Sequence, residues 1–137
     1  MKLKYLVAVF SLSVISVAHG QHCRVGNTTS NQMQLHPIYM SQSAMSFSVD
    51  CNQSYGVRFS TRNLQSNTGR SFLMNDQNYK LRTQMQIIGA SANNWNAVLP
   101  GNGINNKYTV MVQVVDSPSE FTPAGKYMDN LYISLVF

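Results

Sequence analysis

The amino-acid sequence predicts an all-β fold, an antiparallel sandwich of about six or seven short strands. Three observations support this fold class. Apolar residues alternate with polar ones in several runs, turn-forming residues separate these runs, and two cysteines follow an apolar N-terminal segment. Alternation with a period of two puts apolar side chains on one face of a strand. No stretch after the first 20 residues has convincing helical spacing.

The alternating runs are spread over the whole chain after its N-terminal segment. They are Met45–Cys51, Tyr55–Phe59, Tyr79–Ile87, Tyr108–Val114 and Leu131–Phe137. The segments between them are rich in Gly, Pro, Asn and Ser, residues that favour turns. These segments are Asn63–Arg70, Gly89–Asn96, Pro100–Asn106 and Ser117–Gly125. Short strands at this spacing are typical of a β-sandwich, and no internal repeat or second domain is evident.

The N-terminus has the pattern of a signal peptide. Lys2 and Lys4 precede an apolar run from Tyr5 to Val17, and Ala18 and Gly20 are small residues before a cut after Gly20. A membrane anchor is the alternative, but a spanning helix needs about 20 apolar residues. Ser11, Ser13 and Ser16 interrupt this run, and His19 follows it closely. We therefore expect residues 1–20 to be removed and residues 21–137 to form one exported domain.

The charge of the expected mature chain argues against nucleic acid as a partner. Residues 21–137 contain eight Lys and Arg against five Asp and Glu, a net charge of +3. These basic residues are spread along the chain, whereas a nucleic-acid footprint requires a clustered basic patch. The remaining polar residues are mostly Asn, Gln, Ser and Thr, as is common on extracellular β-proteins.

Two cysteines, Cys23 and Cys51, lie behind the predicted signal peptide. An even number of cysteines in an exported chain indicates a disulfide, because the compartment is oxidising. The bond would close a loop of about 28 residues, which the chain-entropy description values at about 3 kcal/mol. A redox pair and an intermolecular bridge are the alternatives.

The last predicted strand stays apolar up to the final residue. Its alternating apolar residues are Leu131, Ile133, Leu135 and Phe137. Chain termini usually fray unless another element holds them. We therefore expect this strand to be held by another strand, either from the same chain or from a partner.

Several short segments resemble subunits of bacterial chaperone–usher fibres. They are Cys23–Asn27, Ser48–Cys51 with Tyr55–Phe59, Ser71–Asp76 with Leu81, and the Pro-x-Gly-x-Tyr corner Pro123–Tyr127 before the last strand. In their order and spacing they resemble the Dr/Afa and aggregative-adherence adhesin pilins. They are also similar to the spore-coat-protein-U-like subunits of archaic pili.

This resemblance implies an incomplete immunoglobulin-like sandwich that lacks its final strand. The implied partners are a periplasmic chaperone, which fills the exposed groove, an outer-membrane usher, and neighbouring fimbrial subunits, one of which donates the replacing strand. Leu131, Ile133, Leu135 and Phe137 would line the groove. The implied place of action is a fimbrium on the bacterial surface, where the subunit contributes to virulence by adhesion to host-cell or matrix receptors.

The expected mature chain departs from polymerising subunits at its N-terminus. Only Gln21 and His22 precede Cys23 after a cut at Gly20, which is too short for a donated strand. This favours an acceptor-only subunit at the fibre tip. A monomeric homologue or a misplaced cleavage site are the alternatives.

Catalysis is not expected. His22 and His36 are the histidines left after cleavage, and neither a nucleophile elbow nor a zinc-binding helix motif is present. The five acidic residues are scattered, without a paired carboxylate site. No metal-ligand spacing is present, and no cofactor is expected.

Two features remain as possible receptor contacts. Trp95 lies among asparagines and is either an exposed contact for a sugar or host protein, or a core residue at one end of the sandwich, which we favour. Arg58, Arg62 and Lys80, together with Arg70 and Arg82, form either a basic face or, as we favour, an ordinary solvated surface. The alternative function is a free secreted immunoglobulin-like binding protein that folds without a donated strand.

Overall fold

The computed structural model describes residues 6–16, 23–29, 31–101 and 106–137. Within these ranges all regular elements are strands, and no helix there is long and apolar enough to cross a membrane. The strands are β1 (Leu6–Ser16), β2 (Cys23–Gly26), β3 (Gln32–Leu35), β4 (Gln42–Cys51), β5 (Gly56–Thr61), β6 (Arg70–Met74), β7 (Lys80–Ile88), β8 (Val98–Pro100), β9 (Asn106–Val114) and β10 (Gly125–Val136). The predicted all-β fold is confirmed.

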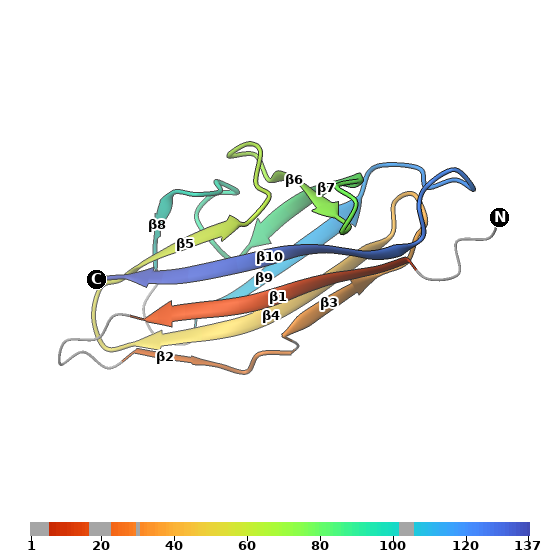
Figure 1. The fold of residues 1–137 in the computed structure, drawn as a ribbon. Coiled ribbons are helices and arrows are strands. Elements are labelled where there is room, and N and C mark those ends of the chain that lie inside the picture. Colours follow the sequence, from red (N-terminus) through yellow and green to blue (C-terminus); the bar gives the residue numbers. More distant parts are fainter. Residues whose placement is uncertain (1–5, 17–22, 30, 102–105) are drawn as a thin grey trace.

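The strands form a sandwich whose two layers are continuous through β6 (Figure 1). The hydrogen-bonded order is β2-β4-β9-β7-β6-β10-β1-β3, with β5 on β10 and β8 on β5. β6 pairs along its length with β7 and touches β10 through Met74 and Met128. All neighbouring strands run antiparallel except β1 and β10, which run parallel. The predicted antiparallel sandwich is confirmed, with this one parallel pair.

Alternating burial explains why the long strands form where the sequence predicts them. In β4, Met45, Phe47 and Val49 are buried, while the residues between them are partly exposed. β7 and β9 show the same period of two. Each strand therefore gives one face to the core and the other to solvent, as the pleat of a strand requires.

An aromatic cluster joins the two layers. Phe59 on β5 lies 5.7 Å from Tyr108 on β9 and 6.1 Å from Phe47 on β4, measured between ring centroids. Phe47 and Tyr108 stack at 5.4 Å. All three side chains are fully buried, and the hydroxyl of Tyr108 is hydrogen-bonded to that of Tyr55 at 3.1 Å. Such offset and tilted aromatic pairs stabilise a core beyond their burial alone.

The strands β2 and β3 follow each other in the sequence but lie in different layers. β2 pairs with β4, and Cys23 and Cys51 are opposite each other and form the predicted disulfide. The backbone N–H of Thr29 still donates a hydrogen bond to the carbonyl oxygen of Ser46 in β4. By Gln32 the chain has crossed to the other layer, where β3 pairs with β1. The disulfide therefore attaches β2 to the layer that holds β4.

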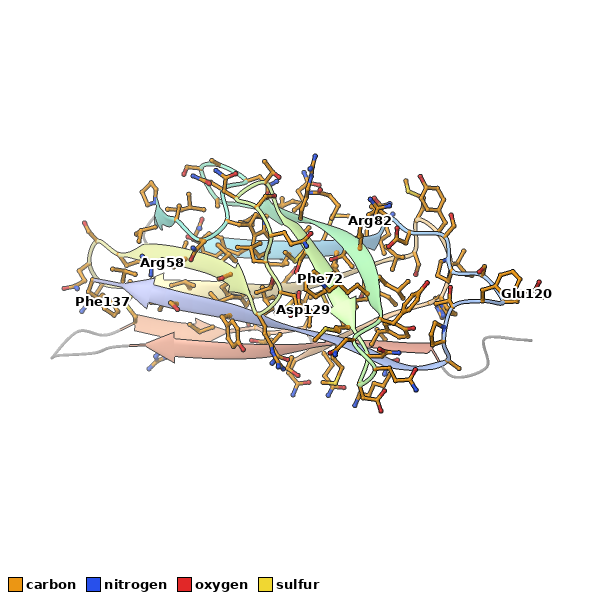
Figure 2. All side chains as sticks on the ribbon, turned by 45° about the horizontal axis from the view of Figure 1, so that its top comes forward. Arg58, Phe72, Arg82, Glu120, Asp129 and Phe137 are labelled. Atoms are coloured by element: carbon orange, nitrogen blue, oxygen red, sulfur yellow. A yellow bond between two sulfur atoms is a disulfide. The ribbon has the colours of Figure 1, made fainter. Side chains whose placement is uncertain are left out.

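A buried carboxylate marks the place where β10 changes partner from β6 to β5. Asp129 is 1% exposed and lies between Met128, paired with β6, and Leu131, paired with β5. Its oxygens accept hydrogen bonds from Asn63 N at 3.0 Å, Ser71 Oγ at 2.6 Å and Asn130 N at 2.8 Å. Burial raises the pKa of Asp129, while these hydrogen bonds act in the opposite direction. Figure 2 shows Asp129 near the middle of the sandwich.

The structure extends the sequence predictions in two places. The last strand begins at Gly125 instead of Leu131, because the predicted turn 117–125 ends there and Asp129 faces the interior with its own hydrogen-bond partners. The described residues form ten strands where six or seven were predicted, and β1, β3 and β8 are additional. Each of β3 and β8 has only one or two buried apolar residues. Such short runs do not show a clear period of two.

Replacing both cysteines, as Cys23→Ser with Cys51→Ser, is expected to lower the free energy of unfolding by about 3 kcal/mol. The physical reason is the entropy that the unfolded chain regains when the loop opens. Urea denaturation at fixed pH measures this difference. The reduced wild-type protein serves as the control and should unfold at the same midpoint as the double variant. Equal stability of the oxidised wild type and the variant would contradict the expected role of the bond.

Asp129→Asn is expected to change how stability depends on pH. Because the pKa of Asp129 is raised in the folded state, its contribution to stability is largest below the pKa of the unfolded carboxyl, about 3.9, and decreases as the pH rises through the folded value. The stability of the wild type relative to D129N should therefore decrease as the pH rises above about 3.9. Denaturation series at several pH values measure the difference.

Asp116→Asn provides a control of opposite sign. Burial alone would raise the pKa of Asp116, but hydrogen bonds and the charge of Arg82 outweigh this and lower it. The stability of the wild type relative to D116N should therefore decrease as the pH falls below about 3.9, the pKa of the unfolded carboxyl, and should not change above it. The same slope in both comparisons would refute the assignment of the effect to Asp129.

Candidate functional site: the strand position between β10 and β3

The strand β1 fills a position in the sheet between β10 and β3, which we call the acceptor position (Figure 1). Its whole length pairs in parallel with β10, from Leu6 opposite Gly125 to Ser16 opposite Leu135. On its other side, Ala8 to Ser11 pair antiparallel with β3. The strand β3 has β1 as its paired neighbour in the sheet order. The acceptor position therefore connects β3 to the rest of its layer.

The occupant of this position is the segment predicted to be the core of a signal peptide. Strand β1 covers residues 6–16, while Gly20 and the predicted cleavage site lie outside the described residues. Removal of residues 1–20 would take β1 out of the sheet. It would leave the backbone N–H and C=O groups of one edge of β10 and of β3 without these partners.

The predicted groove residues at the end of the chain differ in how deeply they are buried. Leu131 and Ile133 are fully buried and Leu135 is 4% exposed, so these three side chains face the core beside the acceptor position. Phe137 lies beyond the end of β10 and beyond the last residue paired with β1, and it is 41% exposed. Phe137 is therefore not part of the buried wall, because the strand ends before it.

The opposite wall of the acceptor position is short. In β3, Met33 is 2% exposed and Leu35 is 5% exposed, while Gln32 and Gln34 face outward. The backbone groups of β3 pair with β1 only from Gln32 to Leu35. A strand in the acceptor position is thus held mainly by β10, and it holds β3 in turn.

Trp95 lies in the core and not on the surface. Its side chain is 1% exposed and packs edge-on against Phe59 at 6.1 Å between ring centroids. Its Nε1 donates a hydrogen bond to Asn93 Oδ1 at 3.0 Å, and the same oxygen accepts Ile87 N. This is the core interpretation favoured from the sequence. A receptor contact through the indole ring has no support, because the ring has almost no accessible surface.

Among the predicted basic residues, Arg70, Lys80 and Arg82 share the outward face of the paired strands β6 and β7, whereas Arg58 lies on β5 and Arg62 follows it. Arg58 lies on β5 near the end of the molecule that holds Phe137, well apart from Arg82 in Figure 2. Arg82 forms an exposed ion pair with Asp116 at 2.7 Å. Lys80 Nζ lies 4.5 Å from the centroid of the Phe72 ring, a cation–π contact. Arg62 follows β5 and lies by the turn after β6, where it lines a hollow with Lys126.

Of the two histidines expected in the mature chain, His36 is among the described residues. His36 is exposed in the loop before β4, with its backbone N–H bonded to Ser41 Oγ, and His22 lies outside the described residues. Among residues 6–16, 23–29, 31–101 and 106–137, no three His, Cys, Asp or Glu side chains gather as a metal site. The buried Asp129 is occupied by structural hydrogen bonds.

No protein-family model matches the sequence, and no curated protein sequence matches it. Among solved structures, the chain is similar to HdaB, the minor tip subunit of the E. coli Hda pilus, with 13% identity and a TM-score of 0.47 over 85% of this chain and 83% of that one. It is also similar to the CsuC–CsuE chaperone–tip adhesion subunit complex from the archaic chaperone–usher Csu pili of Acinetobacter baumannii. There the identity is 20% and the TM-score 0.49, over 85% of this chain and 40% of that one. At these values neither likeness supports a functional inference.

Sequence reasoning missed the strand character of residues 6–16, although a signal was present. Phe10, Leu12 and Val14 alternate with Ser11 and Ser13, which is the period of two found in the other strands. The same residues were interpreted only by their overall apolarity. In the sheet, Phe10, Leu12 and Val14 stand in register with Asp129, Leu131 and Ile133.

Val9→Pro in the full chain is expected to lower the free energy of unfolding by about 1–3 kcal/mol, the cost of a lost buried hydrogen bond. Val9 has Met128 on one side and Gln34 on the other, so its N–H faces a strand at either edge. Val9→Thr is the matched control, since it keeps the β-branch and the N–H, and should change stability less. Hydrogen exchange at β10 and β3 provides a local readout. Unchanged exchange in the Pro variant would contradict the pairing of β1.

Proposed function

We propose that this chain is a structural and adhesive subunit of a bacterial surface fibre of the chaperone–usher type. Its first 20 residues are removed during export, and the vacated acceptor position is filled by a strand from another protein. A periplasmic chaperone supplies that strand first, and a neighbouring subunit replaces it at the outer-membrane usher. The mature N-terminus has too few residues before Cys23 to donate a strand, which favours the tip of the fibre and contact with a host receptor.

The observation that carries this proposal is the position of β1. The segment predicted to be a removable signal peptide lies between β10 and β3. The whole of β1 pairs with β10 from Gly125 to Leu135. Leu131, Ile133 and Leu135 are buried beside it. Removal of such a strand leaves unpaired backbone and apolar side chains, which is the surface that strand addition uses.

A second candidate is a free secreted binding protein that completes its own sandwich. The same strand supports it, because a chain that keeps residues 6–16 has no vacant acceptor position. The two functions differ in one property. The fibre subunit needs a foreign strand after export, whereas the self-complete protein does not.

A comparison of two exported forms tests the proposal. The first carries its own leader, so that cleavage leaves residues 21–137. The second carries a foreign cleavable leader fused ahead of residue 6, so that β1 is kept. Without a chaperone we expect the first form to aggregate or to be degraded, and the second to be soluble and monomeric. Size-exclusion chromatography of periplasmic extracts measures both.

Two controls make the result specific. The second form with Val9→Pro should lose part of its solubility, while Val9→Thr should keep it. Co-expression of the first form with a chaperone encoded next to it should yield a soluble complex. A soluble, monomeric first form without any chaperone would refute the fibre proposal and favour the self-complete protein.

A further inference from the structure

A hollow of about 640 Å³ lies beside the start of β10, on the outside of the sandwich. It is lined from three parts of the chain: the residues after β5 (62–63), the end of β6 with the turn that follows (74–78), and the start of β10 with the residue before it (124–126 and 128). Its volume is within the range of about 300–1,000 Å³ that is typical of small-molecule sites. We refer to it as the β6–β10 hollow.

The walls of the hollow are held in place by hydrogen bonds to buried groups. Asn63 N donates to Asp129, and Asn63 Nδ2 donates to Phe72 O at 2.9 Å and Met128 O at 3.3 Å. Arg62 N donates to Asn130 O at 2.9 Å. Opposite them, the side-chain oxygen of Asn75 accepts Gln77 N and Tyr79 N, which fixes the turn after β6. The hollow is therefore preformed.

The charged groups at the hollow favour an anion. Arg62 and Lys126 line it with exposed side chains, and Asp76 is the acidic residue among the lining residues. Within the described part of the chain, no ion pair is formed by Arg62 or Lys126. Two unengaged cations against one carboxylate leave a net positive charge at this place. An Arg guanidinium is well suited to a planar carboxylate, because its N–H groups match the two oxygens.

The other lining groups favour a sugar over a bare anion. Gln77 and Asn78 supply amides that bond hydroxyl groups, and Met74 and Met128 supply apolar surface for the face of a sugar ring. Asn75 also lines the hollow and is 5% exposed, and its Nδ2 has no hydrogen-bond partner among the described residues.

We infer that the β6–β10 hollow binds a carboxylated sugar at the end or side of a glycan, with its carboxylate on Arg62 and Lys126. The inference gives the adhesive part of the proposed function a ligand class and rests on that part. Sialic acid and hexuronic acids share this chemistry, a carboxylate on a hydroxyl-bearing ring. A substituent of this kind is common on cell-surface and matrix glycans.

The test uses the full chain, refolded with the disulfide formed, so that β1 occupies the acceptor position. The methyl glycosides of sialic acid and of glucuronic acid are titrated into the ¹⁵N-labelled protein and followed by NMR. We expect shifts at residues 62–63, 74–78 and 124–128 with at least one of the two sugars, which also distinguishes the source of the carboxylate. Methyl glucoside and acetate should each bind about tenfold more weakly, since each lacks one half of the recognised chemistry.

Arg62→Gln with Lys126→Gln should weaken sugar binding by about tenfold or more, because both charge-assisted hydrogen bonds are lost. Arg58→Gln is the matched control, an exposed arginine outside the hollow, and should bind like the wild type. The inference is overturned if neither sugar binds, if acetate binds as tightly as the sugars, or if the double variant binds unchanged. If the sugar inference is wrong, the folded chain does not bind the sugars. If the fibre proposal is wrong, residues 21–137 are soluble without a strand from another protein.

Discussion

The edge of β10 that faces β1 needs a strand along its whole length, and the rest of this sandwich depends on that requirement. On its other edge β10 is paired with β5 and β6, but Gly125 to Leu135 are completed by β1. The same strand holds β3, whose buried Met33 and Leu35 close the layer. Backbone groups in a sheet are obligatory hydrogen-bonding groups, so the identity of the strand matters less than its presence.

Two further interactions hold the structure together, the disulfide and the hydrogen bonds of Asp129. The disulfide attaches the start of the mature chain to β4, in the layer that does not contain the acceptor position. Asp129 joins the turn after β5, strand β6 and strand β10 through hydrogen bonds to Asn63 and Ser71. Since Asn63 also lines the β6–β10 hollow, the same buried network that directs β10 shapes the proposed sugar site.

The sequence was sufficient for the parts of the fold that are locally regular. Strands β4, β7 and β9 have long runs of period two, and the cysteine pairing had one intrachain solution. Asp129 was not assigned, because a carboxylate inside a strand is explained only by partners distant in sequence such as Ser71. Trp95 was expected in the core, and Asn93 explains how its indole N–H is satisfied there, because the Asn93 side-chain oxygen accepts it. The β6–β10 hollow could not be predicted from the sequence, because its walls come from three segments that are distant in the chain.

The pairing of β1 with β10 also determines the order in which the fold can be completed. Cys23 and Cys51 are only 28 residues apart, so the pairing of β2 with β4 and their disulfide need only the first part of the chain. Leu6 and Gly125, by contrast, meet across nearly the whole chain. Contacts between distant residues close large loops and form slowly in β-proteins. In a chain that emerges N-terminus first, β10 is the last strand to become available, and the neighbour it meets at that moment decides how the sandwich is closed.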